Sequence, residues 1–270
     1  MILKQVTITK ESMEDEDPYG VILSNIDIIN DLLSNHVRHD EICIQSLKSY
    51  YVDYYLAQLN NGGFSQFVYN SNWNESMISL ILDGLKDIGA VKNLKLFRKS
   101  AKIVSGMSKK NFERFLEGEY FGNFLQINHL NKFDDNFFTL QETENLLQLN
   151  SDWLKSLPSL KVVEQSEREA YIKKLISLVP DLEERSKAAL EAEPRYKKIM
   201  RALCEAANQT LEHETAASHK EIDGQTTWAF HFITNEGHHH MIDFNGKGVM
   251  FKGHTEEVVV EIDANEEYGT

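Results

Sequence analysis

The chain has 270 residues, 41% of them hydrophobic, and a formal net charge of −14 at pH 7. This length and composition suffice for one large domain or two modest ones, each with its own core. Only two cysteines occur, Cys43 and Cys204, which argues against a disulfide framework and favours a reducing compartment. No stretch approaches the roughly 18 consecutive apolar residues of a membrane-spanning helix, and the N-terminus lacks a signal-peptide core. We therefore expect a cytoplasmic protein without membrane contact.

The negative charge is concentrated at the two ends of the chain. Residues 1–40 have a net charge of −5 and residues 221–270 a net charge of −8, whereas residues 41–220 have a net charge of −1. Binding to nucleic acid needs a continuous stripe of lysine and arginine that neutralises phosphates. This charge distribution predicts no direct binding to nucleic acid.

The first 17 residues predict a strand and an acidic loop, because residues 1–10 alternate apolar and polar side chains and residues 14–17 are all acidic. From Pro18, apolar residues recur at helical spacing. The predicted helices lie at about 18–34, 41–59, 78–88, 94–104 and 112–120, with Asn74 and Ser108 as candidate N-caps. They indicate a helical bundle domain over residues 18–157.

Residues 158–222 predict a helical connecting segment, which includes an apolar stripe from Tyr196 to Ala207. The hydrophobic period then changes from 3.6 to 2, and residues 223–270 predict a β-meander of four short strands. A three-residue turn would pair Thr234 with His238 and place Phe232 and His240 on one face. The fold class is mainly α (α+β), a helical bundle domain followed by a small C-terminal antiparallel β-meander.

Seven of the ten histidines lie between residues 213 and 254. The predicted register places His231 and His239 on one face and His238 and His240 on the other, so that at most two or three could share an ion. Position 217 is alanine, which leaves His213 without the second histidine of a zinc-protease motif. We expect no metal site and no cofactor.

Catalytic patterns are missing from the sequence. It contains no G-x-S-x-G nucleophile elbow, no phosphate-binding loop and no dinucleotide-binding glycine pattern. Two adjacent carboxylates, Asp134 and Asp135, suggest the first turn of a helix. We expect that the protein is not an enzyme.

The most distinctive local sequence runs from Gln58 to Asn70 and contains a double glycine surrounded by amides and aromatic residues. One prediction is architectural: a glycine adopts positive φ, and nearby amides bond backbone groups at the turn. The other prediction is a surface loop that presents aromatic rings to a partner. The candidate partner-binding residues are Asn61, Gly62, Gly63, Phe64, Gln66, Phe67, Tyr69 and Asn70.

The segment Asn-Asn-Gly-Gly-Phe-Ser-Gln-Phe at 60–67, with its helical flanks, resembles the bacterial DNA-mimic-protein family. Residues 130–138 resemble a later segment of that family, and the likeness covers about residues 41–150. The resemblance implies a helical domain without an active site, which imitates the phosphate charge of DNA and occupies a DNA-binding protein.

The combined interpretation is a noncatalytic protein-binding or regulatory protein whose partner is another protein, with DNA mimicry as one form of that role. One alternative is an immunity or antitoxin-like neutraliser, suggested by the acidic balance. A second alternative is a metal-dependent enzyme that uses the C-terminal histidines. Residues 86–110 contain eight bases and one acid, which predicts a basic patch on the helical domain.

Overall fold

The computed structural model describes residues 3–117, 125–222, 224–264 and 268. The chain divides into two compact units, residues 1–183 and residues 184–270, and each is described by itself. Within the described residues, no helix combines the length and the apolar character needed to cross a lipid bilayer.

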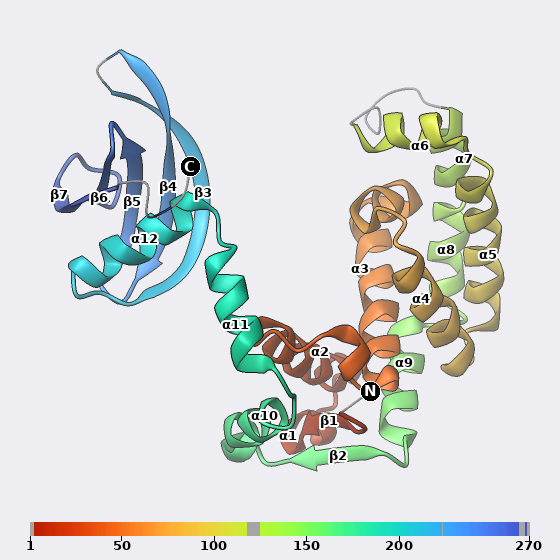
Figure 1. The fold of residues 1–270 in the computed structure, drawn as a ribbon. Helices are drawn as coiled ribbons and strands as arrows, with labels where there is room; N and C mark the ends of the chain where they lie inside the picture. The colour runs from red at the N-terminus through yellow and green to blue at the C-terminus, as the bar shows by residue number, and fades with distance from the viewer. Residues whose placement is uncertain (1–2, 118–124, 223, 265–267, 269–270) are drawn as a thin grey trace. The chain divides into compact units, whose positions relative to one another are not determined.

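The first unit consists of packed helices and a two-stranded parallel sheet (Figure 1). The sheet pairs β1 with β2 in the register Val6↔Leu160. Residues 158–176, predicted as a connecting segment, thus contribute a strand and a helix to this unit. Its elements are β1 (Val6–Thr9), α1 (Lys10–Glu14), α2 (Pro18–Ser34), α3 (Ile44–Ser71), α4 (Glu75–Asp87), α5 (Val91–Ser105), α6 (Lys109–Leu116), α7 (Leu125–Asn131), α8 (Asp134–Gln141), α9 (Leu146–Ser156), β2 (Leu160–Val163) and α10 (Arg168–Ile176).

Helix α3 crosses the centre of this unit and packs against α2, α4 and α9. Its buried face carries Tyr55, whose ring contacts aromatic residues of α3 itself, of α5 and of α8. The ring centroids lie 5.4 Å from Phe67, 5.1 Å from Phe97 and 5.8 Å from Phe137. Edge-to-face pairs at such distances add stabilisation beyond the burial of apolar area. The core of this unit is therefore aromatic and is centred on α3.

The structure confirms several helix starts. Asn74 accepts a hydrogen bond from the Met77 amide, and Ser108 accepts one from the Asn111 amide, as N-caps do. Asp134 and Asp135 lie in the first turn of α8. Tyr120, predicted in the helix after Ser108, lies outside the described residues.

The second unit is an antiparallel sheet of strand order β3-β4-β5-β6-β7 with α12 packed on one face (Figure 1). The mainly α fold class with a C-terminal antiparallel sheet is confirmed. The sequence predicted a meander of four strands, whereas the sheet has five. The elements are α11 (Leu182–Glu191), which spans the division, α12 (Arg195–Ala206), β3 (Leu211–Ile222), β4 (Gln225–Thr234), β5 (Gly237–Phe244), β6 (Lys247–Lys252) and β7 (Val258–Asp263).

The additional strand, β3, overturns the prediction of a helical segment through residue 222. It is an edge strand, and most of its side chains are exposed. An exposed edge strand carries no alternation of apolar and polar residues for the sequence to reveal.

The predicted register of the β4–β5 hairpin is wrong by one residue. Thr234 pairs with Gly237 and Ile233 pairs with His238, so the turn has two residues instead of three. A shift of one residue moves side chains of one strand to the opposite face. Phe232 consequently shares its face with His239 and Met241, in the core against α12. His231, His238 and His240 occupy the other face.

Candidate functional site

The double glycine interrupts helix α3 without ending it. Gly62 has φ −165° and ψ 21°, and Gly63 has φ 75° and ψ −170°, a combination open almost only to glycine. The predicted positive φ is therefore confirmed, at Gly63. The predicted helix end is confirmed as a break in helical geometry at the double glycine, and a second helical stretch follows directly and continues to Ser71. We call Gly62 and Gly63 the glycine kink.

The kink leaves the Phe64 amide without a helical partner, and Asp134 supplies one. The Oδ1 atom of Asp134 accepts this hydrogen bond at 3.0 Å. A Cβ atom at Gly63 would overlap the same carboxylate. Burial raises the pKa of Asp134, and the bond from Phe64 partly offsets this effect. The residues of the two family-like segments, 60–67 and 130–138, thus meet at one point.

The aromatic rings of the motif lie inside the core. Phe64 is 1% exposed and Phe67 is 0% exposed, so the predicted presentation of these two rings to a partner is wrong. Their rings pack around Tyr55. Tyr69 is half-buried against the same core. Burial of two phenylalanines accounts for their place in the motif without a ligand.

The amides of the motif bond each other instead of the backbone. Gln66 donates to Gln58 Oε1 at 3.2 Å, and Asn70 donates to the same oxygen at 2.6 Å. The prediction of bonds from these amides to backbone groups is therefore wrong. Asn61 and Gly62 are exposed beside them. Of the candidate partner-binding residues, only Asn61, Gly62 and Asn70 are exposed.

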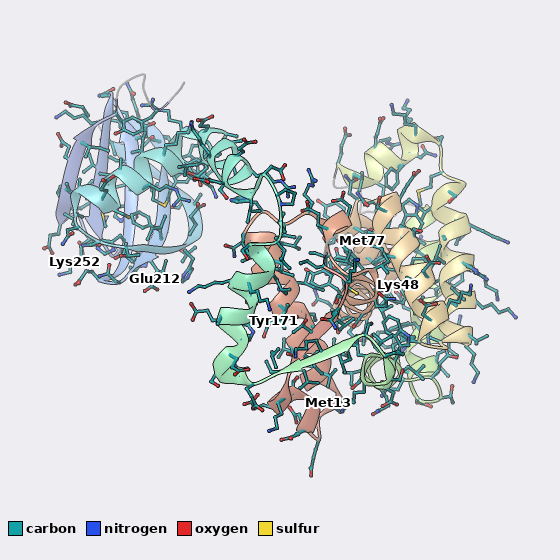
Figure 2. The ribbon with its side chains drawn as sticks, turned by 60° about the horizontal axis from the view of Figure 1, so that its bottom comes forward. Met13, Lys48, Met77, Tyr171, Glu212 and Lys252 are labelled. Carbon is teal, nitrogen blue, oxygen red and sulfur yellow. The ribbon has the colours of Figure 1, made fainter. Side chains whose placement is uncertain are left out.

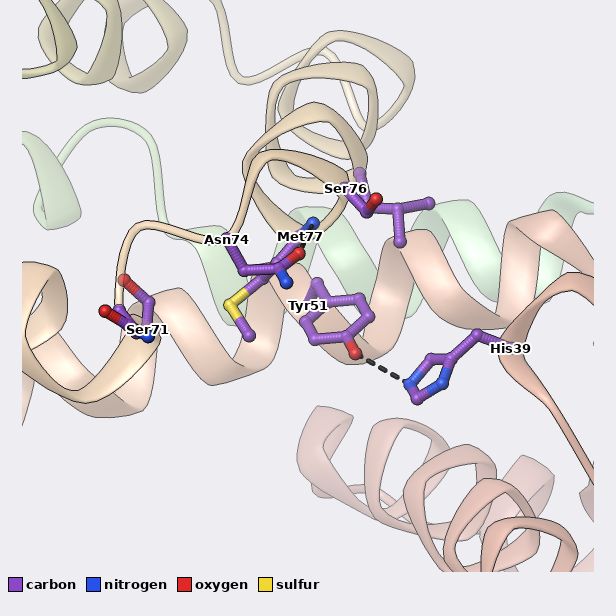
Figure 3. Close-up of a pocket in the computed structure, with 8 residues that line it drawn as sticks. His39, Tyr51, Ser71, Asn74, Ser76 and Met77 are labelled. Carbon is purple, nitrogen blue, oxygen red and sulfur yellow. Dashed lines mark hydrogen bonds between the residues drawn. The ribbon is translucent and has the colours of Figure 1, made fainter. Parts of the chain in front are cut away.

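A pocket of about 480 Å³ lies between α3 and the start of α4 (Figure 3). Its main feature is a hydrogen bond of 2.8 Å between Tyr51 Oη and His39 Nε2. Burial raises the pKa of Tyr51, which keeps the phenol protonated near neutral pH. Neither a carboxylate nor a thiol occurs among its lining residues, which are His39, Tyr51, Ser71, Asn72, Asn74, Ser76, Met77 and Leu80. The pocket offers hydroxyl, amide and imidazole groups for hydrogen bonds.

Helix α5 presents a row of cations to solvent. Its buried side carries Leu94, Phe97 and Val104, and four bases lie on the opposite arc of the helix, three or four residues apart. All four are exposed, and the part of the chain that the structure describes supplies no salt-bridge partner for any of them. We call Lys95, Arg98, Lys99 and Lys102 the α5 basic face. The basic patch predicted from residues 86–110 is present here.

Glu144 fixes the start of α5. Its carboxylate accepts hydrogen bonds from the Lys92 amide at 2.9 Å and the Asn93 amide at 2.6 Å. The buried Asn93 side chain also donates to this carboxylate, at 2.8 Å. These bonds satisfy amides that a helix start leaves open. A capping carboxylate in the loop before α9 therefore holds the basic face in place against the bundle.

Long side chains with nitrogen ends project outward from the helices at the right of Figure 2. Lys48, labelled there, behaves differently, because it packs between α3 and α4 and donates to Asp87 at 2.7 Å. This paired lysine serves packing, in contrast to the unpaired bases of α5.

In the second unit, the observed hairpin register places His231 and His238 on the same face of the sheet, whereas the predicted register placed them on opposite faces. Ligand atoms of His231, His238 and His254 lie within 4.8 Å of one another. Burial, together with the neighbouring imidazoles, lowers the pKa of His231 and of His238. The sequence signal that could have revealed this cluster was the short turn at Asn235 and Glu236, which sets the register.

The comparisons with known proteins identify one family. Residues 40–157 match the family model described as DMP19-like protein. No curated protein and no solved structure matches the chain significantly. The match confirms the resemblance drawn from the glycine motif, and it covers α3 to α9 without the C-terminal sheet. The chain therefore carries a DMP19-like domain at residues 40–157.

Proposed function

We propose that this protein is a noncatalytic regulator whose DMP19-like domain binds an acidic partner protein through the α5 basic face. The observation that carries the proposal is the row of four exposed and unpaired bases. Like charges three or four residues apart destabilise a helix by about 0.2–0.5 kcal/mol per pair. The row therefore does not serve the stability of α5, and it would gain favourable energy from an acidic surface.

A protein partner suits this surface better than a nucleic acid does. The whole chain is strongly acidic, with a net charge of −14, and such a field opposes the approach of a phosphate backbone. Val91, which is 70% exposed, lies on the same arc of α5 as the four bases. An exposed apolar side chain among the cations offers a protein partner apolar area to bury in addition to charges to pair.

The same charges argue against direct DNA mimicry by this domain, since a mimic needs rows of carboxylates with few cations between them. Exposed acids at 14–17 could supply the negative field that a DNA mimic needs, whereas Glu266 and Glu267 lie outside the described residues.

Both cysteines are buried and free, which supports the cytoplasmic location expected from the sequence.

Affinity capture with immobilised full-length protein from a bacterial lysate tests the proposal. The triple variant Lys95→Glu, Lys99→Glu, Lys102→Glu reverses the basic face. Exposed lysines elsewhere in the first unit provide a control of identical charge change, Lys132→Glu, Lys161→Glu, Lys174→Glu. We expect an acidic protein, identified by mass spectrometry, that binds the wild type and the control but not the α5 variant.

The purified partner should then bind with an affinity that falls as salt rises, because salt screens exposed charges. Equal binding by the two triple variants would refute the α5 assignment. Retention of duplex DNA by the basic face would point to a nucleic-acid ligand instead. Displacement of DNA from a DNA-binding protein, lost on neutralising the acids at 14–17, would favour mimicry.

A further inference from the structure

The sheet of the second unit has two faces of different character. One face is closed by α12, where Ile199 and Leu203 pack on Phe232 and Met241. The opposite face carries His231 on β4 and His238 on β5, as alternate positions of paired strands require. His254 follows the end of β6, where the Gly253 amide donates to the His238 carbonyl at 2.7 Å. The side chains of three histidines, from β4, β5 and the loop after β6, therefore lie close together.

The three imidazoles are packed at close range. The centroids of the His238 and His254 rings lie 4.4 Å apart, and those of His231 and His238 lie 5.5 Å apart with nearly parallel planes. One nitrogen from each ring lies within 4.8 Å of a nitrogen of each of the other two rings. We call His231, His238 and His254 the histidine face. Nitrogen atoms at this separation can approach a single ion of the size of Zn²⁺ with small side-chain rotations.

The hydrogen bonds of His231 leave one of its ring nitrogens open. Nε2 of His231 lies 2.9 Å from Ser218 Oγ, whereas its Nδ1 is buried and has no hydrogen-bond partner among the described residues. A metal-binding histidine donates its other ring N–H to an oxygen acceptor, and the Ser218 hydroxyl oxygen can accept such a bond from Nε2 of His231. Buried polar atoms without partners are uncommon in proteins, and a metal ion would satisfy this one.

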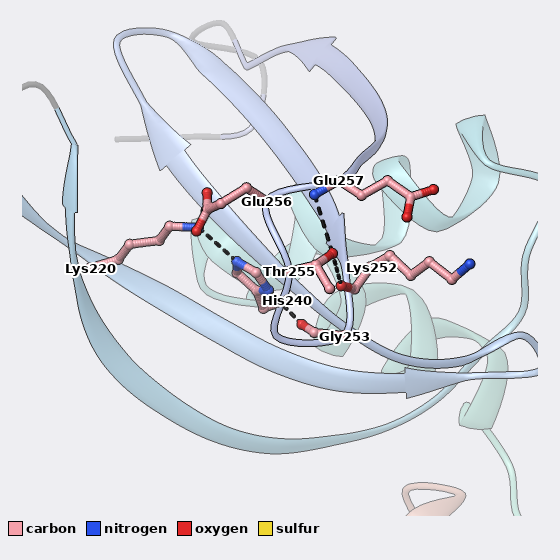
Figure 4. A network of polar contacts seen from close by, with 7 residues as sticks. All are labelled: Lys220, His240, Lys252, Gly253, Thr255, Glu256 and Glu257. Atoms are coloured by element: carbon pink, nitrogen blue, oxygen red, sulfur yellow. Dashed lines mark hydrogen bonds and ion pairs between the residues drawn. The ribbon is translucent and has the colours of Figure 1, made fainter.

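A neighbouring histidine holds the loop that carries His254 (Figure 4). His240 Nδ1 donates to the Gly253 carbonyl at 2.7 Å, and its Nε2 lies 3.0 Å from Lys220 Nζ. Because an ammonium group can only donate, Nε2 is the acceptor and Nδ1 carries the proton. His240 is therefore a positioning residue and is occupied by other bonds.

The rest of the loop is fixed by hydrogen bonds as well. Thr255 Oγ1 donates to the Lys252 carbonyl at 2.6 Å and accepts from the Glu257 amide at 3.2 Å. Glu256 pairs with Lys220 at 2.9 Å, which compensates the ammonium group that lies beside His240. Figure 4 shows these residues around the loop that follows β6. The loop is thus held in shape, and the Lys220 ammonium group is paired with a carboxylate of the loop.

We propose that His231, His238 and His254 form a binding site for a divalent transition metal ion of the Zn²⁺ class. Three imidazoles suit zinc, copper, nickel or cobalt, and a three-histidine set leaves a coordination position for water or another ligand. The expectation of no metal site rested on the predicted hairpin register, which the structure corrects. This site lies outside the DMP19-like domain and does not depend on the function proposed for it.

Calorimetric titration of untagged full-length protein with zinc chloride tests the site. We expect one Zn²⁺ per chain, and affinities lower by at least about tenfold in His238→Gln and in His254→Gln, because each removes one ligand. His213→Gln is the matched control, since His213 is exposed on β3 of the same sheet. Titration with Co²⁺ should give visible absorption bands of a low-coordinate nitrogen site, lost in the same two variants.

His254 is exposed on a loop, so its variant should fold normally, and circular dichroism would verify this. Absence of saturable zinc binding would overturn the proposal. Unchanged affinity in His254→Gln would do the same. Equal weakening by His213→Gln would show that zinc binds surface histidines without a defined site.

Discussion

The glycine kink and the histidine face both join residues that are far apart in the sequence, but they differ in whether their polar atoms have hydrogen-bond partners. At the kink, the Phe64 amide is bonded to Asp134, and Gln66 is bonded to Gln58. At the histidine face, Nδ1 of His231 has no described partner. Polar groups that are hydrogen-bonded to each other need no further partner, and such a junction serves the fold. A ring nitrogen with a free lone pair can still bind a ligand.

The α5 basic face resembles the histidine face in this respect, since its charges are exposed and unpaired within the described residues. The distinctive motif of the DMP19-like domain is thus structural, and the proposed interaction surfaces lie where the sequence is less distinctive. Substitutions at the glycine kink and at the histidine face should therefore have opposite effects on stability and on ligand binding.

The largest effect should follow from Phe67→Ala. Phe67 is fully buried and packs on Tyr55, so its truncation should lower the free energy of unfolding by about 3–5 kcal/mol. Asn61→Ala, at an exposed position of the same motif, should change it by less than about 0.5 kcal/mol. Urea unfolding measures both. A stable Phe67→Ala variant would mean that this ring is not part of the core.

Gly63→Ala should lower the free energy of unfolding by about 2–3 kcal/mol, because alanine strains this backbone conformation and its Cβ displaces Asp134. Gly89 offers a matched control, with φ 76° and open space where the methyl group of an alanine would lie. Gly89→Ala should cost about 1 kcal/mol. Equal losses for the two variants would show that contact with Asp134 contributes nothing.

Asp53 is a partly buried carboxylate on α3, and burial raises its pKa to about 6. The folded protein therefore binds this proton more tightly than the unfolded chain does, and the resulting destabilisation grows as pH rises from about 4 to above 6. Asp53→Asn should stabilise the protein by about 1–2 kcal/mol at pH 8, after allowance for solvent screening, and by little at pH 4. A gain independent of pH, in urea unfolding at the two values, would contradict the raised pKa.

The smallest effect on stability is expected for His254→Gln without metal. The His254 side chain is exposed and forms no hydrogen bond within the described residues, so the free energy of unfolding should change by less than about 0.5 kcal/mol. With zinc present, the wild type should gain thermal stability that the variant lacks. A large loss without metal would indicate that this histidine serves architecture.

Much of the helical fold could be predicted, because helical spacing and caps are local signals. Asn74 and Ser108 illustrate this, since each bonds an amide only three residues away. The bond between Asp134 and Phe64 spans 70 residues, and no local pattern encodes such a distance. The family resemblance included both segments that this bond joins, residues 60–67 and 130–138, but it did not predict the contact between them.

The sheet was harder to predict for two physical reasons. Strand β3 is exposed along most of its length, so burial imposed no period of two on its sequence. The hairpin turn at Asn235 and Glu236 could be assigned two or three residues, and that single choice decided which histidines share a face. The candidate metal site was therefore not predicted, because the expected pairing of β4 and β5 differed from the observed one by one residue.

The most direct test of the contrast is anomalous diffraction at the zinc edge from crystals grown with equimolar Zn²⁺. We predict one strong peak within about 2.0–2.1 Å of a nitrogen from each of His231, His238 and His254, and none at the glycine kink. Absence of a peak at the three histidines, in crystals whose zinc content is verified, would contradict the assignment of this face as the open site of the molecule.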